Sequence, residues 1–201
     1  MATLVIATRN KGKIAEIARI LSFDSGIQIR SVSEFDLADI EETGTTFEEN
    51  AALKALTVAR ATGFAALADD SGLEVEALHG APGIFSARFA GSHGDNLANN
   101  EKLLAELKNV PSDERAARFV AVIAVAKPDG STIMARGELA GEIALTAEGQ
   151  NGFGYDPLFL PRGSEKTLGE FEPRAKDEIS HRARALAEIA PRIPLFLSGG
   201  E

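Results

Sequence analysis

The chain carries its most informative residues at positions 66–75, which read Ala66-Leu67-Ala68-Asp69-Asp70-Ser71-Gly72-Leu73-Glu74-Val75. Two adjacent carboxylates stand between two short apolar segments, and the second segment alternates apolar and acidic residues as a half-exposed strand would. We therefore predict that Asp69 and Asp70 lie on a turn at a strand end. Adjacent side chains of an extended backbone point to opposite faces, so at most one of the two acids can then face a given cleft. The composition suits an ordinary surface turn as well as a site where Ser71-Gly72 helps to hold a metal or a phosphate.

Length and composition limit the class of protein. The 201 residues, 44% hydrophobic and 25% charged, predict one globular domain over residues 1–201. A net charge of −9 argues against a binder of nucleic-acid polymers, which needs a basic face. The chain has no cysteine, which excludes disulfides and thiolate chemistry and is compatible with a reducing cytoplasm. The apolar run at Leu4–Ala7 is too short for a signal peptide or a membrane span, so we expect a soluble, cytoplasmic protein with no membrane partner.

A polar loop follows the first predicted strand. Leu4–Ala7 has the composition of a buried strand, and Thr8-Arg9-Asn10-Lys11-Gly12-Lys13 comes directly after it. A helix should follow, because four residues have the spacing of one buried helical face: Ile14, Ile17, Ala18 and Leu21. A loop of this kind at a helix start favours phosphate, although it matches neither a P-loop nor a dinucleotide fold. The alternative is a polar loop with solvated lysines.

A second helix is predicted from about Phe47 to Thr62. Thr46 and Glu49 have the spacing of a capping box, and Gly63 is a typical stop. Asn50 and Lys54 would share a face of this helix. Upstream, Glu41 and Glu42 could supply a carboxylate to a divalent ion or simply form a solvated acidic face.

The remaining segments predict further strands and helices. Apolar and β-branched residues indicate a strand near 27–32, a hairpin of strands 118–126 and 132–136, and another strand at 138–144. Residues 95–108 have the pattern of a helix, with Asn100, Leu103, Leu104 and Leu107 on one face. These elements predict a mixed β-sheet flanked by helices.

Two later stretches have unusual compositions. In Asn151-Gly152-Phe153-Gly154-Tyr155-Asp156-Pro157-Leu158-Phe159, glycines alternate with aromatic rings on which a base could stack, although a turn that fills a core would look similar. In 176–183, Ser180 is a plausible N-cap of a helix that buries Ala183, Leu186, Ala187 and Ala190. Lys176, His181 and Arg182 would then lie near a helix start, where cations are unfavourable without an anionic or electronegative ligand.

Taken together, these motifs resemble the inosine/xanthosine triphosphate pyrophosphatase family. The resemblance covers nearly the whole chain in order and rests on residues 8–13, Glu41-Glu42-Thr43-Gly44 with Asn50 to Lys54, 68–73, Ser86-Ala87-Arg88-Phe89-Ala90-Gly91, 152–159 and Ser180-His181-Arg182. It implies an elongated mixed α/β fold of two lobes with the active-site cleft between them, assembled as a homodimer. Arg9 departs from the pattern, since many relatives carry glycine there.

The resemblance also implies an activity. The enzyme would hydrolyse ITP, dITP and XTP to the nucleoside monophosphate and pyrophosphate with Mg²⁺, held by Glu41 (or Glu42, if the register slips) and Asp70. Asp70 would also be the catalytic residue, either as general base or only as metal ligand. The substrate-binding residues would be Thr8, Arg9, Asn10, Lys11, Gly12, Lys13, Lys54, Ser71, Phe153, Gly154, Tyr155, Asp156, Lys176, His181 and Arg182. A nucleotide sensor without chemistry, or a hydrolase of ordinary nucleotides or another phosphoanhydride, stays open.

Overall fold

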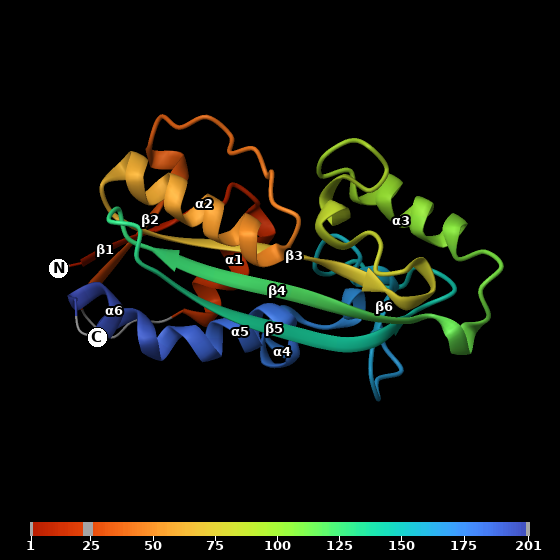
Figure 1. The fold of residues 1–201 in the computed structure, drawn as a ribbon. Coiled ribbons are helices and arrows are strands. Elements are labelled where there is room, and N and C mark those ends of the chain that lie inside the picture. The colour runs from red at the N-terminus through yellow and green to blue at the C-terminus, as the bar shows by residue number, and fades with distance from the viewer. Residues whose placement is uncertain (1, 22–25, 200–201) are drawn as a thin grey trace. The chain divides into compact units, whose positions relative to one another are not determined.

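The structure is a computed structural model that describes residues 2–21 and 26–199. Its strands are β1 (Ala2–Ile6), β2 (Ile27–Ser31), β3 (Ala65–Val75), β4 (Ala116–Ala126), β5 (Thr132–Ile143) and β6 (Phe159–Pro161). Its α-helices are α1 (Lys11–Ile20), α2 (Phe47–Thr62), α3 (Asn96–Glu106), α4 (Pro173–Ile179), α5 (His181–Ile189) and α6 (Ile193–Ser198), drawn in Figure 1. Within these residues no helix has the length and apolar composition needed to cross a membrane.

The strands form one mixed sheet in the order β2-β1-β3-β4-β5-β6. Strand β1 is parallel to both β2 and β3, whereas β5 and β6 are antiparallel. The predicted mixed sheet with surrounding helices is therefore confirmed. The prediction of separate strands at 132–136 and 138–144 was wrong, because β5 runs unbroken through Gly137. The alternation of buried positions continues across that glycine, at Ala135, Gly137 and Leu139, so nothing interrupts the pairing.

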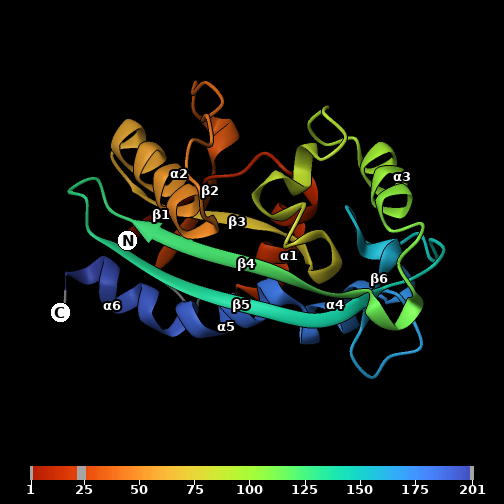
Figure 2. The same cartoon turned by 45° about the vertical axis from the view of Figure 1, so that its right-hand side comes forward.

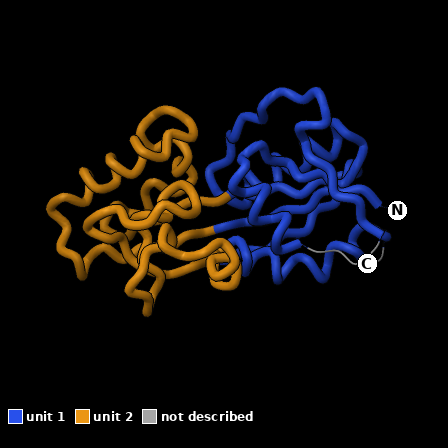
Figure 3. Tube along the Cα trace, turned by 180° about the vertical axis from the view of Figure 1, so that it is seen from behind, with its two compact units in different colours: residues 1–70, 121–137, 182–201 blue, residues 71–120, 138–181 orange. Residues whose placement is uncertain are grey.

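The chain divides into two compact units, coloured separately in Figure 3. Unit 1 comprises residues 1–70, 121–137 and 182–201, and unit 2 comprises residues 71–120 and 138–181. Each unit has its own apolar core: one contains Leu4, Leu67 and Ile123, and the other contains Leu73, Phe119 and Leu158.

In unit 1, helices cover both faces of the strands, as Figures 1 and 2 show for α2 on one side and α5 and α6 on the other. Alternate residues of β1 divide between the faces. Leu4 and Ile6 pack with Ile17 and Leu21 of the α1 segment and with α5 and α6. Two predicted inward positions were wrong. Ala18 is exposed and Glu16 is buried in its place, because Arg182 pairs with Glu16 inside the protein.

The second wrong position is Ala187 of α5, which is exposed. Ala185 and Ile189 are buried instead, together with the predicted Ala183 and Leu186. Residues 185 and 189 are one turn apart, so the buried stripe of α5 is rotated from the predicted one.

Helix α2 has the predicted bounds. The Thr46 hydroxyl oxygen accepts a hydrogen bond from the backbone N–H of Glu49 at 3.1 Å, and Gly63 ends the helix with a φ of 72°. The Glu49 carboxylate accepts a hydrogen bond from the Thr45 N–H at 2.6 Å. In an ideal capping box it would accept from the N–H of the N-cap residue, Thr46.

In unit 2, α3 begins after Asp95, whose side chain accepts from Ala98 N, and buries Leu103; Leu107, directly after the helix, is buried as well. The predicted helix at 95–108 is thus confirmed with shorter ends. Phe119 of β4 and Phe159 of β6 pack with ring centroids 4.7 Å apart in the core of this unit.

Candidate active site

The two adjacent acids lie inside a strand. Strand β3 runs without a break from Ala65 to Val75, so the predicted turn at Asp69-Asp70-Ser71-Gly72 was wrong. Asp69 is 2% exposed and Asp70 is 6% exposed, far less than the acids of a surface turn. Partly buried lysines and the buried Arg182 neutralise both carboxylates, so the strand can continue where the local sequence favours a turn.

The pleat of β3 separates the two carboxylates. The Asp69 side chain lies on the same face of β3 as Ala65 and Leu67, which pack in the core with α1, α5 and α6. Its partners Lys13 and Arg182 come from α1 and α5. The Asp70 side chain lies on the opposite face of β3, and its partner Lys54 comes from α2. Because neighbouring side chains on a strand point to opposite faces, one strand serves two different clusters.

Asp69 belongs to a buried network of ion pairs. Its carboxylate lies 2.5 Å from Lys13 Nζ and accepts from Arg182 Nε at 2.8 Å and Nη2 at 3.3 Å. Arg182 Nη1 donates to Glu16 Oε2, so one guanidinium joins two acids. Burial alone would raise the pKa of Asp69, but the charges of Arg182 and Lys13 outweigh it and hold that pKa well below its usual range.

Asp70 has a different environment. Lys54 Nζ donates to Asp70 Oδ1 at 2.7 Å, to Glu42 Oε1 at 2.8 Å and to the Asp69 carbonyl oxygen at 3.0 Å. Within the described residues, Asp70 Oδ2 is buried and has no hydrogen-bond partner. Burial raises the pKa of Asp70, although Lys54 and Lys13 oppose this. The carboxylate thus combines an unsatisfied oxygen with a raised proton affinity.

Both clusters lie at the switch point of the parallel strands, where the chain places β2 on one side of β1 and β3 on the other. Strand β1 stands between β2 and β3, and Ala7 N donates to Leu67 O at 2.7 Å at the carboxyl end of β1. In open α/β sheets, ligands bind outside the carboxyl ends of strands at such a switch point. The Thr8–Lys13 loop leaves β1 at this place and leads into α1.

The loop residues have individual contacts. Asn10 is the N-cap of α1, and its Oδ1 accepts from Lys13 N at 3.1 Å. Thr8 Oγ1 accepts from Asn10 N at 3.2 Å. Arg9 donates to Asp39 Oδ1 and to the Leu37 carbonyl, so its guanidinium is bound to the segment of residues 37–39. Lys11 is exposed, and Lys13 is the loop cation that enters the Asp69 network.

The acidic residues can be tested as a Mg²⁺ site. In the described ranges no three His, Asp or Glu side chains come together as a metal-binding group. Mg²⁺, however, usually takes one or two carboxylates together with substrate phosphates and water. Asp70 Oδ2 is a buried acceptor that an ion could satisfy. Glu41 is exposed and makes no ion pair in the described part of the chain, whereas Glu42 pairs with Lys54. The unsatisfied Asp70 oxygen therefore fits Mg²⁺ as one carboxylate ligand.

In unit 2, Asp156 organises the glycine-aromatic loop. Its Oδ2 accepts from Phe153 N at 2.8 Å and lies 2.5 Å from Lys176 Nζ, which is 4.8 Å from the centroid of the Phe153 ring. Gly152 has a φ of 74°, and a Cβ there would lie 2.0 Å from Asp156 Oδ2. Glycine is required at this position, since the buried carboxylate occupies the space of a side chain.

Tyr155 lies in the core of unit 2. Its ring is 4% exposed, and its hydroxyl donates to the Ser86 carbonyl at 2.9 Å. Asn100 Nδ2 donates to the Gly154 carbonyl at 3.1 Å, which ties the same loop to α3. The Tyr155 ring therefore offers no open face to a base, while Phe153 is only partly buried.

The segment before α5 differs from the prediction. The helix itself begins at His181, directly after Ser180, as predicted; what differs is that Lys176 lies in a separate preceding helix, α4. The His181 ring stacks on Phe119 with centroids 4.7 Å apart and planes 10° apart. Arg182 is 1% exposed and its guanidinium binds Asp69 and Glu16. In this structure the guanidinium donors of Arg182, a predicted substrate-binding residue, hold the two acids.

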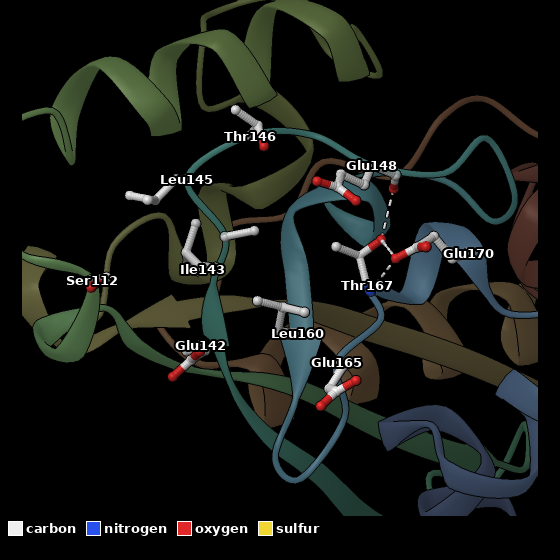
Figure 4. A pocket seen from close by; sticks show the side chains of 11 residues that line it. Ser112, Glu142, Ile143, Leu145, Thr146, Glu148, Leu160, Glu165, Thr167 and Glu170 are labelled. Atoms are coloured by element: carbon white, nitrogen blue, oxygen red, sulfur yellow. Dashed lines mark hydrogen bonds between the residues drawn. The ribbon is translucent and has the colours of Figure 1, made fainter.

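A separate cavity in unit 2 has a volume of about 330 Å³ (Figure 4). Its lining includes Glu142, Glu148, Glu165 and Glu170 and no lysine or arginine. None of the predicted site residues lines it. A cavity with this charge would repel a triphosphate, so the candidate site is not here.

Sequence reasoning missed two residues of unit 1. Glu16 follows Lys13 by one helical turn, a spacing that places both on one face of α1. Asn50 was noted only as a neighbour of Lys54; it is fully buried, and its Oδ1 accepts from Gly44 N at 2.8 Å. Their partners lie in other elements, so only the position of Glu16 on its helix hinted at its role.

The fold and site define an α/β protein that has buried carboxylates paired with partly buried lysines at the switch point of a sheet, which is a setting for phosphate-bearing ligands. The chain belongs to the Ham1 family, whose model matches residues 4–192. A Nocardia farcinica protein named dITP/XTP pyrophosphatase is 48% identical over 196 residues, covering 96% of this chain and 95% of its own. A Lactiplantibacillus plantarum protein of the same name is 50% identical, covering 93% of this chain and 92% of its own. The structure of a HAM1 protein from Coxiella burnetii matches with a TM-score of 0.88 at 40% identity, covering 96% of this chain and 99% of that one.

Proposed function

We propose that this protein hydrolyses deaminated purine nucleoside triphosphates, namely ITP, dITP and XTP, to the monophosphate and pyrophosphate. The observation that carries the proposal is Asp70: a buried carboxylate bound on one oxygen by Lys54 and without a hydrogen bond on the other, among the described residues. Relatives that share about half of their residues with this chain are named dITP/XTP pyrophosphatases, which supports the substrate class.

The residues of unit 1 would hold the triphosphate. Lys13 and Lys54 supply positive charge beside the two acids of β3. A triphosphate could exchange places with a carboxylate as the partner of either ammonium group, because both form charge-assisted hydrogen bonds. The N–H groups at the start of α1 favour an anion as well. The proposed contacts of the triphosphate in unit 1 are Thr8, Arg9, Asn10, Lys11, Gly12, Lys13 and Lys54, and Ser71, the first residue of unit 2, is proposed as a further contact.

Asp70 would accept the proton of the attacking water. A carboxylate with a raised pKa is a better base than a free one, and its unsatisfied oxygen is available to a water molecule. Lys54 fixes the other oxygen and so fixes the orientation of the group. In the alternative role, Asp70 Oδ2 would instead bind Mg²⁺ together with Glu41, and the ion would neutralise charge on the phosphates. Glu42 would keep Lys54 in place.

The residues of unit 2 would recognise the base. Phe153 would offer a ring face for stacking, and Asp156 would hold the Phe153 backbone and Lys176 in position. The backbone at Gly154 and Tyr155 would complete the wall. Lys176 and His181 would supply donors to the oxygen at position 6 of hypoxanthine or xanthine, where adenine carries an amino group.

A pyrophosphate-release assay tests this function. The purified full chain is given ITP, dITP, XTP, ATP, GTP and dATP, each with Mg²⁺ and with excess chelator. We expect kcat/KM for the three deaminated substrates to exceed that for the ordinary purines by about 100-fold or more, the discrimination that sites with buried polar groups achieve. Equal rates on all six would indicate a general phosphoanhydride hydrolase, and binding without turnover would indicate a sensor.

The state and place of the protein are also proposals. We expect a homodimer, as the family resemblance implies, and light scattering of the purified chain measures it. The nucleotide pool that such an enzyme would protect lies in the cytoplasm, where we expect the protein.

A further inference from the structure

Asn50 of α2 has two ends that are treated differently by the fold. Its Oδ1 accepts a hydrogen bond from Gly44 N at 2.8 Å. Its Nδ2 is buried, and within residues 2–21 and 26–199 no group accepts a hydrogen bond from it. Because the Gly44 N–H can only donate, it fixes which end of the amide is oxygen, so the group left unsatisfied is a donor.

The surroundings of Asn50 are those of the Asp70 cluster. Lys54, one turn later on the same face of α2, donates to Asp70 and to Glu42. Gly44 follows Glu42 by two residues, so the Oδ1 bond ties the loop of the two glutamates to the helix that carries Lys54. The approach is close: a Cβ at Gly44 would lie 2.7 Å from Asn50 Oδ1.

Asn99 of α3 provides a comparison. It is also a buried asparagine, 2% exposed, but it uses both ends: Oδ1 accepts from Ala90 N at 2.7 Å, and Nδ2 donates to the Ala87 carbonyl at 3.4 Å. An asparagine that only anchors a loop can thus satisfy its whole amide. Leaving a buried N–H donor unsatisfied is unfavourable, so its partner is expected to be a group that binds from outside the chain.

We propose that Asn50 is a further substrate-binding residue whose Nδ2 donates a hydrogen bond to an oxygen of the triphosphate, while Oδ1 holds the loop of Glu41 and Glu42. The inference rests on the proposed function, since it takes the triphosphate as ligand. An anion is the fitting partner because the neighbouring donor on this face of α2 is the Lys54 ammonium group.

Calorimetric binding of inorganic tripolyphosphate in Mg²⁺-free buffer tests the inference without turnover. We expect Asn50→Leu to weaken binding about tenfold or more, the effect of a lost hydrogen bond to a charged group. Asn50→Asp keeps a side-chain oxygen for the Gly44 N–H, and so keeps the loop, but removes the Nδ2 donor, so it should weaken binding at least as much as Asn50→Leu. Asn99→Leu, the matched control, should lower the Tm and leave the Kd unchanged. Asn50→Ser replaces Asn50→Leu if the latter does not fold.

Each result decides the matter. Wild-type affinity in Asn50→Leu would mean that a buried water satisfies the donor. Wild-type affinity in Asn50→Asp, which keeps the bond to Gly44, would mean that Asn50 acts only through the loop. Either result overturns the proposal, as does a wild-type chain that binds no tripolyphosphate. A wild-type chain that binds tripolyphosphate but hydrolyses neither dITP nor XTP would refute the proposed function and leave the Asn50 comparison valid.

Discussion

Lys54 Nζ donates to Asp70 Oδ1 at 2.7 Å and leaves the second oxygen of this carboxylate without a hydrogen bond among the described residues. The lysine therefore both orients Asp70 and keeps one oxygen available. Asp69, the preceding residue, differs in every respect: two cations hold it on the other face of the strand, and its pKa is well below normal. The two acids of one strand thus have different environments, which fits the proposal that Asp69 positions other groups and Asp70 takes part in the chemistry.

The role of Asp69 predicts a stability effect. Asp69→Asn leaves Lys13 without its paired acid and Arg182 with Glu16 alone, so we expect the free energy of unfolding at pH 7 to fall by about 3–5 kcal/mol. Denaturant titration measures it. Asp39→Asn is the control, since Asp39 forms an exposed pair with Arg9 and should change stability by less than about 1 kcal/mol.

The same residue predicts a pH dependence. Because the folded pKa of Asp69 lies below the unfolded value near 3.8, the stabilisation is complete above that value and is lost as pH falls from about 4 toward the folded pKa. Wild-type stability should therefore decline more steeply below pH 4 than that of Asp69→Asn. Parallel profiles for the two proteins would argue against the buried network.

Lys13 is predicted to act on the phosphates and not on the base. Lys13→Ala should weaken kcat/KM for every nucleoside triphosphate by a similar factor, about tenfold or more, because one charge-assisted contact is lost. The ratio of inosine to adenosine triphosphate should stay constant. Lys108→Ala, an exposed lysine outside the proposed site, is the control. A changed ratio would mean that the Thr8–Lys13 loop contacts the base and not the phosphates.

Phe153 is predicted to bind the base. Phe153→Ala removes the partly buried ring of the glycine-aromatic loop. The variant should bind inosine triphosphate with a free energy weaker by about 1–3 kcal/mol, the contribution of one stacked base. Tripolyphosphate, which has no base, should bind as in the wild type. Phe64→Ala serves as the control for loss of a partly exposed ring. Equal weakening of both ligands would exclude a stacking role.

Arg182 is predicted to act through Asp69. Arg182→Ala should lower the Tm and reduce kcat/KM for inosine and adenosine triphosphates by similar factors, because its guanidinium binds Asp69 and Glu16. Steady-state kinetics on both substrates measure the ratio. If the ratio of the two kcat/KM values narrows in the variant, Arg182 contributes to recognition of the base.

Local signals were sufficient for part of this structure. Thr46, Glu49 and Gly63 define both ends of α2 within a few residues of chain, so its bounds could be predicted. The course of β3 could not be predicted, because Asp-Asp-Ser-Gly favours a turn until distant cations neutralise its acids. Arg182 and Glu16, separated by 166 positions, form their pair only through the tertiary fold. The motifs indicated Asp70 and Lys13 as candidates, but the burial of Tyr155 and Arg182 depends on packing that the motifs do not encode.

The central claim is that hydrolysis depends on Asp70, and kcat of Asp70→Asn on dITP at saturating Mg²⁺ tests it most directly. The amide keeps the shape of the side chain but cannot accept a proton in the transition state, so we predict a loss of about 10²–10⁴-fold in kcat, with a smaller change in substrate Kd. Asp69→Asn, measured below its Tm, should lose less. A kcat for Asp70→Asn within about threefold of the wild type, far less than general-base catalysis supplies, would contradict the account.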